Sequence, residues 1–275
     1  MESHLLSASA PSTAQCRRIN FNSTDPPLPE YTDHFAAVID NILTESECND
    51  LIRLAESSTV PAGSPATSGP LWERAMINAG MGKQVLATEE RNCGRIIYDT
   101  PEIAAKLLTR LSPFLSELGL QRIEKKPLVT GLAGRGNAFT LSRLNERLRF
   151  LKYEGGEYFR PHWDAFYTTS DRRERSYYSI HLYLNGDGEQ DVDEFMREMG
   201  KGEGNRDKEG KLLGGSTSFL GQDLTRQVRV FPRTGSVLVF QQNDLLHAGD
   251  AVVRGTKYTM RTDILYESEE KVDDY

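Results

Sequence analysis

Two histidines and one aspartate in the second half of the chain have a spacing that suits metal binding. The segment "RPHWDAF" places His162 two residues before Asp164, and His247 follows 85 positions after His162. On a β-strand, residues two apart point to the same face, so this imidazole and carboxylate can reach one ion together. Two histidines and one carboxylate form the facial triad that holds ferrous iron and leaves coordination positions open. We therefore predict a metal centre at these three residues.

The other three histidines are better interpreted as structural or surface residues than as metal ligands. An H-x-D pair occurs by chance in many chains, so its meaning depends on the surrounding elements. His181 lies inside an apolar, strand-like segment, and His4 and His34 lie near the N-terminus. A single histidine in such a place is more often a satisfied core or surface group. We predict no ligand role for these three.

Two cations follow His247 on the segment "KYTMRTDILY" (257–266). Lys257 and Arg261 lie ten and fourteen residues after His247, and their even spacing places them on one strand face with Thr259. An open triad needs a source of two electrons, and a chelating 2-oxo acid would direct its far carboxylate to a cation. Exposed strand cations are the plain alternative, but this strand is otherwise apolar, and a buried cation needs an anionic partner. Either cation suits a carboxylate, Arg as a two-pronged donor and Lys as a point charge.

The elements around these residues change character along the chain. Residues 1–35 are rich in Ser, Thr and Pro and predict a flexible N-terminal arm. Residues 36–275 follow as a single domain, with helical support over about 36–145 and a β-rich core over about 146–266. Helices are predicted after Thr44, where Glu47 completes a capping box, and from Pro101, with Thr100 as cap. Strands are predicted at 148–153, 177–184, 216–220, 227–231, 236–241 and 257–266, with a solvated excursion at 186–213.

Composition narrows the class of protein. A net charge of −7 and a pI near 5.4 argue against a nucleic-acid partner. The three cysteines are far apart and form no CxxC pair, which argues against a zinc module and for a reducing compartment. No secretory signal and no apolar run of the roughly 20 residues that a membrane helix needs is visible. We expect an intracellular, cytoplasmic protein without a membrane partner.

Several blocks of the chain resemble the prolyl 4-hydroxylase group of Fe(II)/2-oxoglutarate-dependent dioxygenases. The resemblance spans about residues 37–266, and the blocks of the second half occur in the family's order, which is more specific than any single motif. The upstream segments "VIDNILTESECNDLI" and "ERNCGRI" also resemble the family. The later blocks are "LKYEGGEYFRPHWDAF", "SIHLYLN", "GGSTSFL", "PRTGSVLVFQ" and "LLHAGDAVVRGTKYTMRTDILY".

The resemblance implies a fold and a set of ligands. The fold is mainly β with flanking helices, a double-stranded β-helix of the jelly-roll or cupin-like kind. Fe(II) is expected on the triad, and the distal carboxylate of 2-oxoglutarate on Lys257. Tyr153 and Tyr183 match positions where a tyrosine hydroxyl often lines the co-substrate pocket, and strand packing is their plain alternative. Arg261 lies where many members of the family carry a smaller residue, so it is expected to share the co-substrate carboxylate, contact substrate or pair with Asp263.

The resemblance also implies an activity. With Fe(II), 2-oxoglutarate and O2, such an enzyme oxidises an unactivated C–H bond, most simply to an alcohol, and releases succinate and CO2. The substrate is expected to be a peptide, as for a prolyl hydroxylase, or a small molecule, as for a tailoring oxygenase of the same cofactor class. A non-catalytic, metal-binding cupin-type domain would keep the triad but need no Lys257 pocket, and an interaction domain would need neither.

A polar segment beside the metal site is the candidate substrate region. Residues 165–176, "AFYTTSDRRERS", leave the strand of His162 without a strong period and predict a mobile loop. Its arginines would favour an anionic substrate, although a solvated turn is the plain alternative. Two further arginines of "ERNCGRI" are expected to add to the same basic rim. The candidate substrate residues are Arg172, Arg173, Arg175, Arg91 and Arg95.

Overall fold

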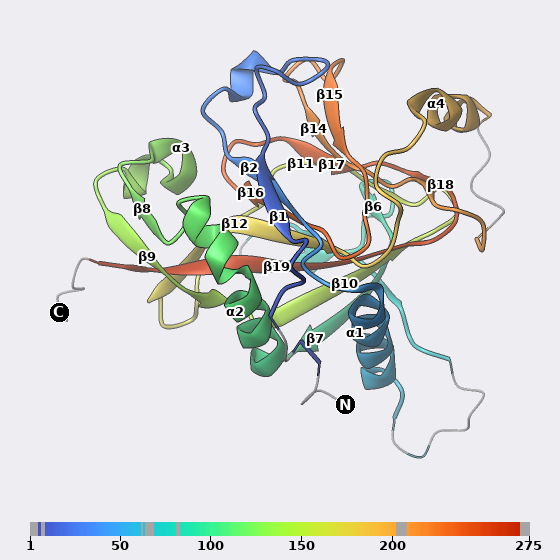
Figure 1. Cartoon of the computed structure of the whole chain (residues 1–275), viewed down its shortest axis with the longest axis horizontal. Coiled ribbons are helices and arrows are strands. Elements are labelled where there is room, and N and C mark those ends of the chain that lie inside the picture. The colour runs from blue at the N-terminus through green and yellow to red at the C-terminus, as the bar shows by residue number, and fades with distance from the viewer. Residues whose placement is uncertain are drawn as a thin grey trace.

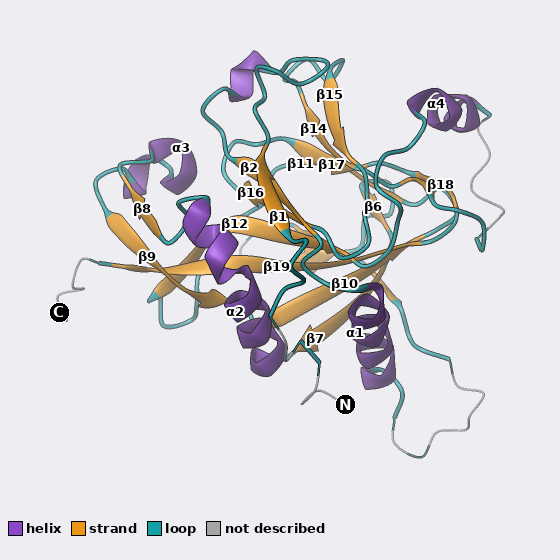
Figure 2. Cartoon of the chain, in the orientation of Figure 1, coloured by secondary structure: helices purple, strands orange, loops and turns teal. Residues whose placement is uncertain are grey.

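Two antiparallel sheets face each other, and helices cover the outer side of the larger one (Figures 1 and 2). They are seen in a computed structural model, which describes residues 5–6, 9–61, 63, 69–80, 83–201 and 208–269. His4 lies outside the described residues.

The larger sheet has ten strands among the described residues. Its order is β1-β2-β16-β12-β19-β10-β7-β3, and β9 pairs with β19 and with β8. The strands are β1 (Gln15–Arg18), β2 (Ala36–Asp40), β3 (Glu73–Arg74), β7 (Gly94–Asp99), β8 (Arg122–Glu124), β9 (Ala138–Leu144), β10 (Arg147–Tyr153), β12 (Glu174–Tyr183), β16 (Val237–Gln241) and β19 (Lys257–Ser268).

The smaller sheet has the order β15-β14-β17-β11-β6. Its strands are β6 (Arg91–Asn92), β11 (Tyr158–His162), β14 (Thr217–Leu220), β15 (Gln227–Val230) and β17 (His247–Gly249). Two short pairs lie beside the sheets, β4 (Ile77–Asn78) with β5 (Gln84–Val85) and β13 (Leu213–Gly214) with β18 (Val252–Arg254). This two-sheet architecture confirms the predicted jelly roll with flanking helices.

Alternation along the strands of the larger sheet separates two buried layers. On β16, Val237 and Val239 belong to the apolar cluster that includes the helices, whereas Leu238 and Phe240 belong to the cluster between the sheets. Because side chains alternate with period two, each strand supplies one residue set to each layer. The inner set carries the polar groups that form the site.

The predicted helices begin where their caps place them. Helix α1 (Glu45–Ser58) has a complete capping box between Thr44 and Glu47, and α2 (Pro101–Glu117) is capped by Thr100. Both predictions are confirmed. Their apolar stripes pack on the larger sheet, with Leu51 and Leu107 buried. Shorter helices are η2 (Pro29–Tyr31), α3 (Pro127–Thr130), η3 (Leu132–Gly134) and α4 (Val192–Gly200).

Three segments differ from the sequence-based expectations. In the predicted arm, β1 pairs with β2, and Phe21 and Leu28 are buried between the sheets, because apolar residues among the polar ones anchor this stretch. The region of helical support also supplies β2, β7 and β9 to the larger sheet. The predicted excursion at 186–213 contains α4, because Asp191 caps it and Phe195 buries its ring. The single domain over 36–275 stays a prediction.

No helix within the described residues is both long and apolar enough to cross a membrane.

Candidate metal centre

The two metal-type histidines lie on adjacent strands of the smaller sheet. Strands β11 and β17 pair antiparallel, and His162 lies directly opposite His247. Their ring centroids are 4.3 Å apart. Asp164 follows two residues after the end of β11, and one ligand atom from each of the three residues lies within 4.8 Å of the others. The structure therefore brings the predicted triad together.

Both imidazoles are turned so that Nε2 faces the aspartate. The Nδ1–H group of His162 donates to the Arg160 carbonyl at 2.8 Å, and that of His247 donates to the Leu245 carbonyl at 3.1 Å. A carbonyl can only accept, so Nε2 carries the free lone pair, as in histidines that ligate metals. His247 Nε2 is buried without a hydrogen-bond partner among the described residues. This orphaned atom fits a metal ligand.

The electrostatics favour the protonation states that a divalent cation needs. Burial, together with the neighbouring His247, lowers the pKa of His162 to about 3, and burial lowers the pKa of His247 as well. Burial acts to raise the pKa of Asp164, but the Arg261 guanidinium and the histidines outweigh it, and this pKa lies well below its usual range. Two neutral imidazoles and one carboxylate result, which is a donor set that fits Fe(II).

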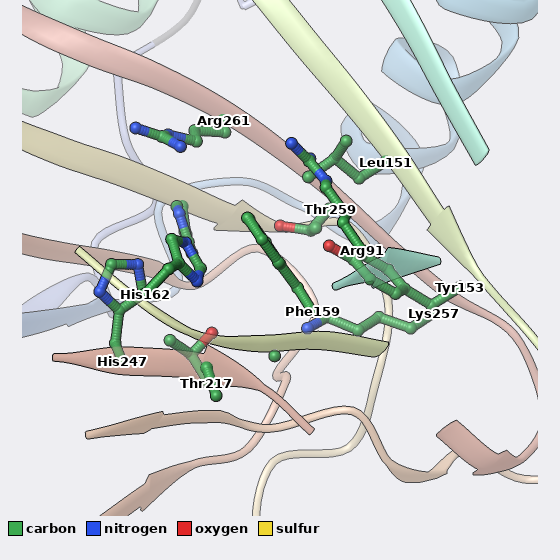
Figure 3. Close-up of a pocket in the computed structure, with 13 residues that line it drawn as sticks. Arg91, Leu151, Tyr153, Phe159, His162, Thr217, His247, Lys257, Thr259 and Arg261 are labelled. Carbon is green, nitrogen blue, oxygen red and sulfur yellow. The ribbon is translucent and has the colours of Figure 1, made fainter. Parts of the chain in front are cut away.

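A cavity extends from His162 and His247 between the two sheets, and its empty space of about 420 Å³ includes open solvent. Figure 3 shows His162 and His247 at one end, Lys257 and Tyr153 at the other, and Phe159 between them. The lining residues are Arg91, Leu151, Tyr153, Phe159, His162, His181, Thr217, His247, Ala248, Gly249, Lys257, Thr259 and Arg261.

Lys257 is a buried cation at the far end of this cavity. Its side chain is 3 % exposed, and burial lowers its pKa to about 8. Its Nζ lies 5.1 Å from the ring centroid of Tyr153 and 5.6 Å from that of Tyr183. Within the described ranges, no carboxylate forms an ion pair with it. Asp250 acts on it at longer range and is already paired with Arg229 at 3.1 Å.

The two tyrosines occupy different places. Tyr153 lines the cavity, and burial raises its pKa. Tyr183 lies beneath Lys257, and its hydroxyl donates to Thr217 Oγ1 at 2.8 Å. Thr217 itself lines the cavity, so Tyr183 supports the wall from behind.

Arg261 lies at the metal end rather than at the Lys257 end. Its Nη1 is 2.9 Å from Asp164 Oδ1, and its Nη2 is 3.5 Å from Asp263 Oδ1. Of the three alternatives, the structure contains the pair with Asp263. It also contains a stronger pair with Asp164 that the sequence did not indicate.

The five candidate substrate arginines are not brought together. Arg91 lines the cavity with its guanidinium 4.5 Å from the Phe159 ring centroid, whereas Arg95 donates to Gln84 Oε1 at 3.3 Å outside the lining. The remaining three are on the segment 165–176. None of them lines the cavity.

The segment 165–176 forms a hairpin that leads into β12, instead of the expected mobile loop. Thr169 N–H donates to the Glu174 carbonyl at 3.0 Å, and Ser176 N–H donates to the Tyr167 carbonyl at 2.8 Å. Arg175 stacks over Phe166 at 4.3 Å. These contacts close the turn. Strand β12 begins at Glu174, three residues before the strand predicted at 177–184, so the end of the segment belongs to the strand.

Sequence reasoning missed His181 and Ser179. Both lie on the inner face of β12 with Tyr183, two residues apart, so period-two spacing was the available signal. His181 lines the cavity, and Ser179 Oγ donates to Asp164 Oδ2 at 2.5 Å. Burial lowers the pKa of His181 well below its usual value, so it stays neutral beside the triad.

Comparison with known proteins adds a family and a fold. Residues 148–262 match the model of the 2OG-Fe(II) oxygenase superfamily. Among solved structures, a prolyl hydroxylase from Trichoplax adhaerens in complex with a hypoxia inducible factor peptide fragment is 14 % identical, with 86 % of each chain covered and a TM-score of 0.50. A prolyl-4-hydroxylase from Pseudomonas putida is 14 % identical, with 86 % of this chain and 95 % of that chain covered and a TM-score of 0.47. No curated protein sequence matches the chain.

The solved structures and the family model support different conclusions. At 14 % identity, the T. adhaerens enzyme supports the fold alone. The family match covers β10 to β19, the stretch that contains the triad and Lys257. Residues 148–262 therefore match a 2OG-Fe(II) oxygenase domain, which points to a non-haem iron dioxygenase that uses 2-oxoglutarate and O2, and the structure has a jelly-roll fold.

Proposed function

We propose that this enzyme binds Fe(II) through His162, Asp164 and His247, and the distal carboxylate of 2-oxoglutarate through Lys257. One observation carries the proposal: the two histidines of the candidate triad line a cavity together with a buried cation that has no carboxylate partner among the described residues. A metal-binding domain without catalysis would need the triad but no such cation. Burying an unpaired ammonium is unfavourable by several kcal/mol, roughly, unless an anion joins it.

The chain's own residues position the reactants. When bound, iron and 2-oxoglutarate supply the oxidation, in which O2 is consumed, succinate and CO2 leave, and a substrate C–H bond is hydroxylated. The two histidines and Asp164 act as ligands rather than proton carriers, since the pKa values of His162 and Asp164 lie far below neutrality and burial lowers that of His247. Lys257 orients the co-substrate along the cavity, and the stacked ring of Phe159, 3.6 Å from that of His162, limits water beside the ligand.

We propose that the substrate carries an anionic group that Arg91 binds. Arg91 is 7 % exposed, its Nε is buried without a hydrogen-bond partner among the described residues, and it lines the cavity. Such a deep guanidinium favours a small molecule with a carboxylate.

A peptide substrate has support of a different kind. Trp163 is 61 % exposed although it stands between two candidate ligands, and Met76, whose carbonyl accepts from Arg91 at 3.5 Å, is 38 % exposed. These apolar groups would suit a longer chain with an apolar portion at the mouth of the cavity. A peptide is also the ligand of the T. adhaerens enzyme. We therefore keep peptidyl hydroxylation beside small-molecule tailoring.

A coupled-turnover screen tests both parts of the proposal. Succinate formation is measured with Fe(II) over proline-rich peptides and small carboxylic acids, each beside its amide. We expect stimulation by carboxylates, lost by roughly tenfold or more in Arg91→Met. The matched control, Arg95→Met, changes an equally buried arginine outside the cavity lining. Equal stimulation by acids and amides would contradict the Arg91 role, and no succinate under any condition would contradict the whole proposal.

A reducing, intracellular compartment is also proposed. Cys16, Cys48 and Cys93 are all free thiols in the structure, and two of them are buried. Burial raises the pKa of Cys48 to about 12, which keeps it unreactive.

A further inference from the structure

Arg261 contacts the carboxylate of the candidate metal ligand Asp164. Its Nη1 is 2.9 Å from Asp164 Oδ1, and its Nη2 donates to Ser179 Oγ at 3.3 Å. Ser179 in turn donates to Asp164 Oδ2 at 2.5 Å. Both oxygens of the carboxylate are thus held by donors that are not metal ligands.

A second buried carboxylate fixes Arg261 in this position. Asp263, which is 2 % exposed, accepts from Gln242 Nε2 at 3.1 Å and from Arg149 Nη1 at 3.1 Å, and Arg261 Nη2 lies 3.5 Å away. Asp263 lies two residues after Arg261 on β19, so both side chains point to the inner face. Because Arg149 holds Asp263 at a shorter distance, the charge of Arg261 is directed mainly at Asp164.

This arrangement changes what Asp164 offers to an ion. A carboxylate whose two oxygens both accept from other donors does not turn freely, and each oxygen has one lone pair fewer for an ion. The guanidinium also offsets the negative charge of Asp164. It therefore weakens the attraction for a divalent cation and strengthens the attraction of the metal-loaded site for a dianion.

We propose that Arg261 is a positioning residue that keeps Asp164 a one-oxygen ligand and shifts the site from metal affinity toward affinity for 2-oxoglutarate. The inference rests on the proposed assignment of Asp164 to the metal.

Metal and co-substrate titrations separate this role from a merely structural one. Arg261→Met removes the charge and the donors but keeps a long side chain. Arg149→Met is the matched control, because Arg149 pairs with the same Asp263 and has no ion pair with Asp164 among the described residues. Co(II) is titrated into the metal-free protein by calorimetry, and 2-oxoglutarate is then titrated into the Co(II)-loaded protein.

We expect Arg261→Met to bind Co(II) about threefold more tightly or better, and 2-oxoglutarate about tenfold more weakly or worse. The visible absorption of Co(II) should weaken as a second carboxylate oxygen enters its coordination. Arg149→Met should stay within about twofold of the wild type in both titrations, and Arg261→Lys should retain most of the co-substrate affinity because it keeps the charge.

Unchanged affinities in Arg261→Met would overturn the proposal, and so would equal losses in Arg149→Met. If Arg261→Met does not fold, Arg261→Gln and Ser179→Ala undergo the same titrations. Both should shift the two affinities in the same directions, and unchanged affinities in both would overturn the proposal. A wild-type protein that binds no Co(II) would overturn the metal assignment itself, which is a different result from unchanged variants of a metal-binding wild type.

Discussion

At the scale of single residues, the cavity is lined by polar and charged groups whose burial without a partner is unfavourable. His247 Nε2 has no hydrogen-bond partner and Lys257 no carboxylate partner among the described residues, and both lie on the inner layer between the sheets. Neither group has a partner of the complementary kind. A metal cation would be that partner for the imidazole, and a carboxylate of 2-oxoglutarate would be that partner for the ammonium.

Lys257→Ala should weaken 2-oxoglutarate binding most among the cavity residues that are not metal ligands. Breaking one buried charged pair is unfavourable by about 3–5 kcal/mol, which corresponds to roughly a hundredfold or more in affinity. Titration of the Co(II)-loaded variant measures this, and Co(II) binding itself should not change. If Arg261→Ala weakens 2-oxoglutarate binding more than Lys257→Ala, the distal carboxylate is held by Arg261 instead.

The affinity for 2-oxoglutarate should also depend on pH through Lys257. Burial lowers the pKa of this ammonium to about 8 in the free protein, and a bound carboxylate raises it again. Binding therefore takes up a proton above pH 8, and the affinity should fall by up to about tenfold per pH unit there and stay level below it. Lys257→Arg is the control, since a guanidinium does not titrate, and its profile should be level. A wild-type profile level to about pH 9.5 would contradict this role.

At the scale of elements, the sequence predicted the features that depend only on residues close together in the chain. The cap of Thr44 and the apolar stripe of α2 are local, and so is the H-x-D pair, although β11 ends at His162 and Asp164 lies two residues beyond the strand. The pairing of β11 with β17, which places His162 opposite His247, is not local: the sequence predicted that the two histidines share a metal, but not that their strands pair. The sequence did not predict the contact of Ser179 or of Arg261 with Asp164. Which face of a strand is buried depends on the sheets that pack around it, and a single strand's sequence does not show this.

The exposed arginines of the hairpin at 165–176 should have no role in substrate binding or turnover. Arg172 and Arg173 lie at its tip, are exposed and do not line the cavity. Replacing both by Ser should leave coupled turnover and uncoupled 2-oxoglutarate decarboxylation within about twofold of the wild type, as is usual for surface substitutions. Loss of coupled turnover alone would assign them to substrate binding, as the sequence suggested.

At the scale of the whole molecule, the fold does not depend on the ion. One apolar cluster joins α1 and α2 to the larger sheet, and a second fills the space between the sheets. The candidate metal ligands lie between the two sheets, in a framework that these clusters already hold. A pre-formed site of this kind binds its ion without being folded by it.

Removal of metal should therefore leave the protein folded. With a chelator, the melting temperature should change by no more than a few degrees, whereas Co(II) with 2-oxoglutarate should raise it by mass action, since ligands that bind only the folded state stabilise it. Differential scanning calorimetry measures both. Unfolding at room temperature on chelation would contradict this view and would make the ion structural.

The central claim is that His162, Asp164 and His247 hold the iron that drives 2-oxoglutarate turnover. Oxygen-dependent succinate formation with Fe(II) tests it most directly, in the wild type, in His247→Ala and in the matched control His34→Ala. His34 is equally a buried histidine, but it lies outside the cavity lining. We predict that succinate forms in the wild type and in His34→Ala, and that it falls to background in a folded His247→Ala protein because one of three ligands is lost. Full activity in His247→Ala would contradict the assignment.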